Sequence, residues 1–477
     1  MITDALSPDR ALRMYMGSFI QTASLKDAVG LRGDRWEPGK PLKLLLACYT
    51  GTRNTGADVR VEEMIRQFRH ILGDGNLALT IMTLDPELSA DYFEGVQQIL
   101  MPQVFPRFLY RECPKHHGVV ACEGSMFKSK FAEALTTMMA GALGMAAAED
   151  KLCVGYGAEA GAMSPSLKSF VAKHCKNALV ICRNEPSRKV LEDMGIRTRG
   201  GTDTAWTFEP SPPERGAGLL RNAGWDGKKK VLIVCPINPF WWPVRPSLYK
   251  FAANRLAGRY GEQHYKSIYF HDWSGEAARK YNRYLDALAT AVTAFRNEED
   301  VLPVLVGMER LDRRACERLA ERLDPKPPLF ISDEHNMYDL VSILRNGSMM
   351  VSSRFHAIVC SMPAQVPSVG VTMDERIRNL MNDRGHADFF LEVDDPDLGD
   401  RLLALLRRMP RETDAIRDQI GCAVPGQLRL MGQMGIDFVD EVRRVYPEFT
   451  PPNLKRTWED HLPPLPATVK RLLETYA

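Results

Sequence analysis

The chain has 477 residues, more than one hydrophobic core normally covers, so we expect at least two domains. Lys and Arg number 62 against 60 Asp and Glu, a formal net charge of +2. This balance excludes a general electrostatic attraction to nucleic acid or to an anionic membrane. Any site for an anionic ligand must therefore be local.

The sequence gives little indication of a targeting segment, a membrane span or disulfide bonds. The N-terminal residues MITDALSPDRALRMYMGSF contain Asp4 and Asp9 and lack the apolar core of a signal peptide. The longest mainly apolar stretch, Leu135 to Ala148, is too short to cross a bilayer. Ten cysteines occur without a CxxC motif, which indicates reduced core thiols and no metal site. We predict a cytoplasmic protein, with the inner face of the membrane as an alternative location.

Residues 1–40 predict a helical extension that ends in the connector LRGDRWEPGKP. Strand and helix patterns then alternate: PLKLLLACYT precedes VEEMIRQFRHIL, whose apolar residues recur at helical spacing. Further short apolar runs predict buried strands, namely LALTIMTL, HGVVACEG, KLCVGYG and NALVICR. The alternation predicts a mostly parallel sheet with helices on both faces over residues 41–215.

The stretch from Phe208 to Lys230, rich in Pro, Gly and charge, is typical of a linker. The alternation restarts at VLIVCPINP and, after an insertion at residues 236–280, continues to VPSVGVT, which predicts a second domain over residues 226–410. Residues 411–477 predict a helical C-terminal segment. The expected fold class is therefore α/β, with two Rossmann-like doubly wound domains that face a cleft. Ligands of such folds bind at the carboxyl ends of the strands.

The segment SMMVSSRFHAIVCSMP predicts a strand, an N-cap at Ser352 or Ser353, and a helix from Arg354 to Ser361. Arg354 and His356 would then lie in the first turn, where unpaired N–H groups and the helix dipole favour a phosphate or carboxylate. Arg354 is suited to bind such an anion, and His356 to donate a proton near neutral pH. The alternative is an arginine paired with a carboxylate and a histidine packed in the domain core.

Loops after the first-domain strands contribute small and polar candidates. In CYTGTRNTG, glycines allow a ligand close to the backbone, and Arg53 and Asn54 offer donors. The later candidates in this domain are Gly124, Ser125, Gly157 and Arg183. The glycines are equally consistent with simple turns. Asp203 is expected either to orient Arg183 or to cap a turn.

The loop PINPFWWPVRPS opens the second domain. Asn238 and Arg245 are candidates for substrate contact there. Trp241 and Trp242 provide either an apolar face for a ligand or a structural plug.

Taken in order, these segments resemble the polysaccharide pyruvyl transferase family from about Leu44 to Gly385. The matching segments are YTGTRNTG, EGSMF, GYGAEAGAMSPS, ICRNEPSRKVLEDMG, DTAW and SRFHAIVCSMPAQVPSVGVTMDERI. The family is similar to two-Rossmann (GT-B) glycosyltransferases, and its members transfer a pyruvyl group from phosphoenolpyruvate to sugar hydroxyls as a ketal. The resemblance implies that Arg354 and the helix start at Ser353 bind the donor anion and that His356 is the proton donor. It implies neither a metal nor a cofactor.

The sequence departs from the family's usual motifs mainly in the first domain. The altered positions are Ala57 (usually Asp), Glu123 (usually Gly), Asn184 (usually Asp) and Arg376 (usually Lys). We therefore expect the acceptor to be the part of the reaction that differs. The expected acceptor is a saccharide, with a nucleotide- or lipid-linked form as an option.

Two other functions stay open on the sequence alone. One is a GT-B-type glycosyltransferase that uses a nucleotide sugar, and the other is a non-catalytic relative that kept the fold. The sequence predicts no nucleic-acid partner and no transmembrane segment, and it leaves the oligomeric state open.

Overall fold

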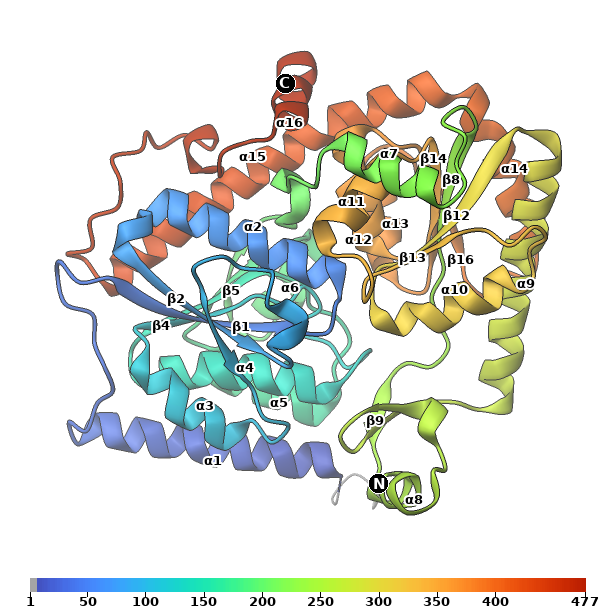
Figure 1. The fold of residues 1–477 in the computed structure, drawn as a ribbon. Helices are drawn as coiled ribbons and strands as arrows, with labels where there is room; N and C mark the ends of the chain where they lie inside the picture. The colour runs from blue at the N-terminus through green and yellow to red at the C-terminus, as the bar shows by residue number, and fades with distance from the viewer. Residues whose placement is uncertain (1–6) are drawn as a thin grey trace.

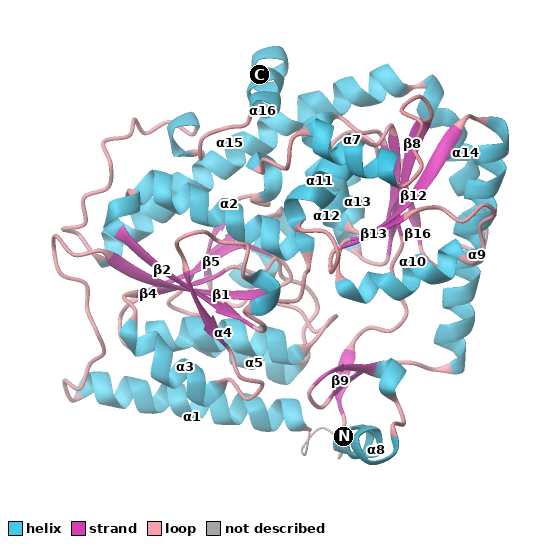
Figure 2. Cartoon of the chain, viewed as in Figure 1, coloured by secondary structure: helices cyan, strands magenta, loops and turns pink. Residues whose placement is uncertain are grey.

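The computed structural model describes residues 7–477 and builds the chain around two parallel β-sheets (Figures 1 and 2). The first sheet has seven parallel strands in the order β3 (Gln97–Leu100), β2 (Leu77–Thr83), β1 (Leu42–Thr50), β4 (Gly118–Ala121), β5 (Leu152–Ala158), β6 (Leu179–Cys182) and β7 (Arg197–Gly200). Every residue of β5 is buried, as expected of a central strand with both faces covered.

Helices cover both faces of this sheet. One face carries a layer made of α1 (Pro8–Ala28), α3 (Pro106–Glu112), α4 (Glu133–Ala147) and α5 (Pro165–His174). A separate hydrophobic core lies beneath that layer and includes Met16, Leu109 and Leu143. The other face carries α2 (Thr55–Leu72), while α6 (Glu185–Glu192) connects β6 to β7. The core on the α2 side continues into the second domain, so the two domains are joined by buried apolar contact.

The second sheet has six parallel strands in the order β13 (Leu329–Ile331), β12 (Val301–Gly307), β8 (Lys230–Cys235), β14 (Met349–Ser352), β15 (Ser368–Thr372) and β16 (Phe390–Glu392). On one side lie α9 (Gly275–Glu298), α10 (Arg313–Ala320) and α14 (Leu398–Arg411). On the other lie α7 (Pro213–Asn222), α11 (Met337–Arg345) and α12 (Phe355–Ser361), and α13 (Glu375–Asp383) packs against β15. The predicted α/β class with two Rossmann-like domains is confirmed.

The insertion between β8 and α9 forms a small unit of its own. Three antiparallel strands pair in the order β10 (His264–Lys266), β11 (Tyr269–His271) and β9 (Val244–Pro246). Between β9 and β10 lie the helix α8 (Leu248–Ala257) and a short 3-10 helix (Gly261–Gln263). Figure 1 shows this unit at the edge of the molecule, close to the start of α1.

The C-terminal segment returns to the first domain. The long helix α15 (Thr413–Val445) starts next to α14 and runs back to contact α2, β5 and β7. Phe438 stacks on Phe68 of α2 with ring centroids 4.3 Å apart. The last helix, α16 (Ala467–Tyr476), packs on α15. This segment therefore ties the two domains together.

The predicted start of the helix after β14 is wrong by one residue. The helix begins at Phe355, and Arg354 is its N-cap, without a side-chain hydrogen bond to the helix. Neither serine caps it: the Ser352 hydroxyl accepts from the Arg354 N–H, and the Ser353 hydroxyl contacts the Tyr284 hydroxyl at 2.8 Å. The Ser352 hydroxyl is engaged within its own turn and the Ser353 hydroxyl with Tyr284 of α9. Neither serine is therefore available as the N-cap, and Arg354 occupies that position.

Candidate functional site

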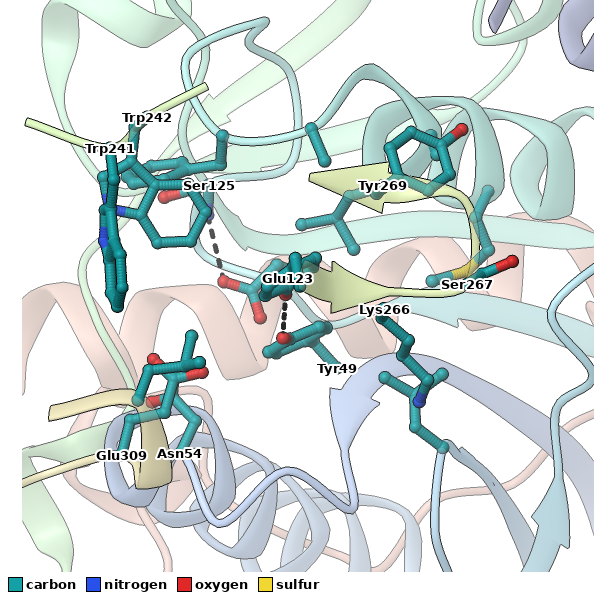
Figure 3. A pocket seen from close by; sticks show the side chains of 18 of the residues that line it. Tyr49, Asn54, Glu123, Ser125, Trp241, Trp242, Lys266, Ser267, Tyr269 and Glu309 are labelled. Atoms are coloured by element: carbon teal, nitrogen blue, oxygen red, sulfur yellow. Dashed lines mark hydrogen bonds between the residues drawn. The ribbon is translucent and has the colours of Figure 1, made fainter. Parts of the chain in front are cut away.

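A cavity lies between the two domains, where strands of both sheets end (Figure 3). The end of β1 and the loops after β1 and β4 supply the first-domain wall, including Tyr49, Asn54, Glu123 and Ser125. Loops after β8, β12, β14 and β15 supply the second-domain wall, including Asn238, Glu309, Asp312, Arg354 and Arg376. The carboxyl ends of parallel strands thus meet at one cleft, as the α/β pattern predicts.

The insertion closes a further side of this cavity. Lys266, Ser267 and Tyr269, from β10, β11 and the turn between them, lie opposite Trp241 and Trp242 (Figure 3). Most of the remaining wall is apolar and comes from the first domain, with Leu84, Met101, Phe105, Phe131, Leu135 and Met138. The cavity therefore offers a polar part between the domains and an apolar part beside the first domain.

Both tryptophans line the cavity, and Trp241 also has the structural role that the sequence allowed. Trp242 lines the cavity and meets Phe131 edge-on, with ring centroids 5.2 Å apart. Trp241 stacks flat on His271 at 4.0 Å and holds it buried. Burial lowers the pKa of His271 to about 4, so the ring under Trp241 stays neutral at physiological pH.

Arg354 lies at the cavity wall in an ion pair with two carboxylates. Its Nε donates to Asp312 at 2.8 Å, and its Nη2 donates to Glu309 at 3.0 Å and also to Asp312. The predicted alternative, an arginine paired with carboxylates, is therefore the arrangement in the structure. Burial raises the pKa of Glu309 to about 7, although the Arg354 charge opposes the shift. Glu309 is thus a carboxyl group able to hold a proton near neutral pH.

His356 lies beside the cavity, between the two domains. Its Nε2 is 3.2 Å from an Asp203 carboxylate oxygen, and its ring lies against Gly56 at the start of α2. Burial lowers the pKa of His356, and the charge of Asp203 opposes this without reversing it. Because Asp203 is an acceptor, the neutral ring carries its proton on Nε2.

Substitution of Gly56 tests this contact. A Cβ at Gly56 would lie 2.2 Å from the His356 Nδ1, and the His356 side chain is only 17% exposed. We expect Gly56→Ala to destabilise the protein by about 1–3 kcal/mol, because overpacking forces a shift of the ring or of α2. In the double variant with His356→Ala the clash is absent. The alanine at position 56 should then cause no loss of stability beyond that of His356→Ala alone. Thermal unfolding measures both.

Gly218→Ala is the matched control for this experiment. Gly218 also lies in a helix, α7, but a Cβ there meets nothing within 4 Å. Its replacement should leave stability unchanged or raise it by about 0.5–1 kcal/mol, the helix propensity of alanine over glycine. An equal loss at both positions would contradict the Gly56–His356 contact.

Asp203 is the centre of a buried charge network. Its carboxylate accepts from Arg183 Nη1 at 3.0 Å and pairs with Arg60 Nε at 3.0 Å. Burial alone would raise the pKa of Asp203, but the charges of Arg60, His356 and Arg183 outweigh it and hold the pKa well below its usual range. A second Asp203 oxygen accepts from the Ala205 N–H at 3.1 Å, so Asp203 both orients Arg183 and caps a turn.

Glu159 extends this network toward the second domain. It accepts from Arg183 Nη2 at 2.7 Å and from Lys128 Nζ at 2.8 Å. Burial opposes its ionisation, but these two cations lower the pKa of Glu159 to about 2. Lys128 also pairs with Glu375 at 3.0 Å. A smaller opening beside the cavity is lined by Glu159, Arg183, Asn184, Asp203, Phe355 and Arg376.

The predicted glycines of the first domain have a packing reason. A Cβ at Gly124 would lie 2.9 Å from Arg183 Nη1, and one at Gly157, where φ is +65°, 2.8 Å from Arg60 Nη2. Because glycine has no side chain, Gly124 leaves room for the Arg183 guanidinium and Gly157 for that of Arg60. Arg60 itself had no signal in the sequence, because it occupies an ordinary helical position in α2.

The predicted candidates fall into three groups in the structure. Those lining the large cavity are Asn54, Ser125, Asn238 and Arg354. Those next to the buried network are Gly124, Gly157, Arg183 and His356. Arg53, Arg245 and Ser353 are not among the residues that line the large cavity. Arg53 Nη1 donates to the Tyr92 hydroxyl at 2.5 Å, and Arg245 is exposed on β9.

Glu309, Asp312 and Arg376 are charged cavity residues that were not predicted as site candidates from the sequence. Glu309 and Asp312 follow directly after β12, so their place at the end of a predicted strand was an available signal. Arg376 follows β15, pairs with Asp374 and lies over the Phe131 ring at 5.0 Å. It lines both the large cavity and the smaller opening.

Neither a metal cluster nor a membrane span is found in residues 7–477. No three His, Cys, Asp or Glu side chains in that range come together in a way suited to hold a metal ion. Over the same residues, no helix combines the length and apolarity needed to cross a bilayer.

The family comparison matches residues 142–375, just under half of the chain, to the model described as polysaccharide pyruvyl transferase. The resemblance to the polysaccharide pyruvyl transferase family is confirmed over these residues, while the predicted segments YTGTRNTG and EGSMF lie before them. The matched segment begins within α4 and ends at the start of α13, so it contains Glu159, Arg183, Asp203, Arg354 and His356. The protein is a transferase by this relationship. No curated protein matches the chain.

Solved structures support the two-domain fold. Anabaena HepE, solved in complex with UDP and glucose, has a TM-score of 0.50 at 12% identity, over 85% of this chain and 98% of its own. TcCGT1, solved in complex with UDP, has a TM-score of 0.50 at 9% identity, over 86% of this chain and all (100%) of its own. At these identities the likeness shows the two-domain GT-B-like fold alone.

Proposed function

We propose that this protein transfers a pyruvyl group from phosphoenolpyruvate to hydroxyls of a saccharide. The observation that carries the proposal is the family match over residues 142–375, because it includes the buried network of Asp203, Arg183 and His356 beside the cleft. The proposed reaction needs no cofactor, since phosphoenolpyruvate carries its own leaving group, phosphate.

The donor anion needs cations at the cleft, and Arg376 is suited to this task. It lies where the large cavity meets the smaller opening, on the position where the family usually has Lys. Its Nε and Nη2 face Asp374, which fixes the guanidinium plane. Arg354 is the second cation, because protonation of Glu309 leaves it with one carboxylate partner, so that its charge is balanced and no longer outweighed by two carboxylates.

The reaction then requires one proton at the methylene carbon of the enol. Protonation produces an oxocarbenium-like centre at the neighbouring carbon, a sugar hydroxyl attacks that carbon, and phosphate leaves as a second hydroxyl closes the ketal. We assign the proton to His356, whose imidazolium form Asp203 stabilises. Glu309 is the second group able to hold a proton there, since its pKa is raised to about 7.

The acceptor saccharide would occupy the polar part of the cavity. Asn238, Ser125 and Tyr49 offer hydrogen-bonding groups, and Trp242 offers an aromatic face of the kind that sugars stack on. These residues come from both domains, so the acceptor would bridge them as the donor does.

A glycosyltransferase reaction is the second candidate. It is favoured by one observation, the occurrence of UDP in the complexes of two proteins that share this fold. The two reactions require different donors, so ligand binding separates them.

Thermal unfolding with each donor tests the proposal. A ligand at 100 times its dissociation constant raises the unfolding free energy by about 2.7 kcal/mol, and we expect phosphoenolpyruvate to do so. Arg376→Gln should lose this effect, and Arg376→Lys, which restores the family's usual residue, should keep it. Arg378→Gln is the matched control, because Arg378 lies on the same helix with its side chain 45% exposed. Stabilisation by UDP alone would instead favour the glycosyltransferase, and stabilisation by neither a non-catalytic protein.

A further inference from the structure

Helix α8 of the insertion stands apart from both domain cores. None of its ten residues is buried. It is nevertheless a well-defined helix, because the Ser247 hydroxyl accepts from the Lys250 N–H at 3.2 Å and Gly258 ends it at a φ of +62°. Figure 1 shows it at the periphery, below the second domain and close to the start of α1.

The outward face of α8 is apolar. Leu248, Ala252 and Leu256 recur every four residues and so form one stripe along the helix. Leu248 is 65% and Leu256 89% exposed, and the neighbouring Tyr249 is 66% exposed. A surface helix normally turns such a stripe toward its own core. Here the stripe faces away from the protein.

Positive charge surrounds this stripe. Residues 236–271 contain five Lys or Arg, namely Arg245, Lys250, Arg255, Arg259 and Lys266, against the single acid Glu262. This local excess contrasts with the balanced charge of the whole chain, 62 basic against 60 acidic residues. Arg245, Arg255 and Arg259 are exposed. The segment thus combines exposed leucines and a tyrosine with exposed arginines.

We propose that α8 docks this protein onto an anionic lipid surface. In this arrangement Leu248, Tyr249 and Leu256 enter the boundary between headgroups and acyl chains, while Arg255 and Arg259 meet the anionic headgroups. A symmetric contact between two copies of α8 is disfavoured, because it would bring the same arginines of both copies together. Charge complementarity therefore selects an anionic bilayer as the occupant.

The docking has a consequence for the cleft. The chain that leaves α8 forms β10 and β11, and these supply Lys266 and Tyr269 to the cavity wall. Lipid-bound α8 would hold this side of the cavity near the bilayer, where a saccharide on a lipid carrier is available. The docking itself does not depend on which reaction the cleft catalyses.

Sedimentation of the full chain with lipid vesicles tests the proposal. We expect binding to vesicles of phosphatidylglycerol and phosphatidylcholine, and binding more than tenfold weaker to phosphatidylcholine alone. Each headgroup-facing arginine contributes about fivefold, so Arg255→Gln with Arg259→Gln should weaken binding about 25-fold. Leu248→Glu with Leu256→Glu should weaken it about 100-fold, since two buried leucines are lost.

A matched pair of exposed leucines provides the control. Leu25 and Leu31, at and just beyond the end of α1, are 63% and 69% exposed, and Leu25→Glu with Leu31→Glu should leave vesicle binding unchanged. Unchanged thermal unfolding of all variants checks that they fold. The proposal is overturned if the wild-type chain ignores the anionic vesicles, if the control pair loses binding equally, or if the α8 leucines support only a dimer in solution. Vesicle binding needs no turnover, so its failure leaves the pyruvyl transfer proposal standing.

Discussion

We expect His356→Ala to lower phosphate release from phosphoenolpyruvate, measured with a saccharide acceptor, by about 10²–10⁴-fold, the usual contribution of a general acid. The structure supports this role through the Asp203 carboxylate, 3.2 Å from the His356 Nε2, which stabilises the charged ring. Because burial lowers the pKa of His356, the rate should rise as the pH falls toward the ordinary histidine range.

His70→Ala is the matched control for this result. His70 lies near the opposite end of α2 from Gly56, and its Nε2 contacts the Asp460 backbone oxygen at 2.9 Å. Its loss should leave the rate within about twofold, because His70 is not among the residues that line the cavity. If His356→Ala kept full activity and Glu309→Gln lost it, the proton donor would be Glu309 instead.

The second large effect concerns stability. We expect Asp203→Ala to destabilise the protein by about 3–5 kcal/mol, because it leaves Arg60 and Arg183 buried without their shared carboxylate. Chemical denaturation at neutral pH measures the loss. Asp440→Ala is the matched control: it breaks the exposed pair with Arg456 and should cost less than about 1 kcal/mol.

The pH dependence of this difference follows from the lowered pKa of Asp203. The unfolded chain protonates Asp203 near its ordinary pKa of about 4, while the folded chain keeps it ionised to lower pH. The contribution of Asp203 to the unfolding free energy is therefore complete above about pH 4. It is lost as the pH falls through the lowered pKa that Asp203 has in the folded chain. When both are measured in the His356→Ala background, which removes the histidine coupled to Asp203, the gap between the chain with Asp203 and the Asp203→Ala variant should be constant from pH 8 to pH 5 and shrink in acid. A gap that grew in acid would contradict the network.

Local sequence patterns determined the framework of this protein. Short apolar runs such as LCVGYG and LIVC are buried strands because parallel sheets are covered on both faces. Polar residues directly after such runs lie at one edge of each sheet, and Asn54, Ser125, Asn238 and Arg354 accordingly line one cavity. The position of the cleft thus followed from strand order and chain direction alone.

The partners of the charged residues were decided by the tertiary structure. His356 and Asp203 are 153 positions apart, Arg354 and Asp312 are 42 apart, and no local pattern links either pair. Arg60 gave no signal, because a buried arginine in a helix looks in sequence like an exposed one. The N-cap at Arg354 shows the same limit, because the Ser353 hydroxyl contacts Tyr284 and the Ser352 hydroxyl bonds within the preceding turn.

The sequence by itself therefore determined the α/β class, the resemblance to polysaccharide pyruvyl transferases and the edge of the sheets where the site lies. Only the tertiary structure decided that Arg354 faces carboxylates, that His356 packs between Asp203 and Gly56, and that the apolar stripe of α8 faces outward. The physical reason is the separation along the chain of the residues that determine each feature. Strand and helix patterns depend on neighbours in the chain, whereas ion pairs and exposure depend on how two domains and an insertion pack together.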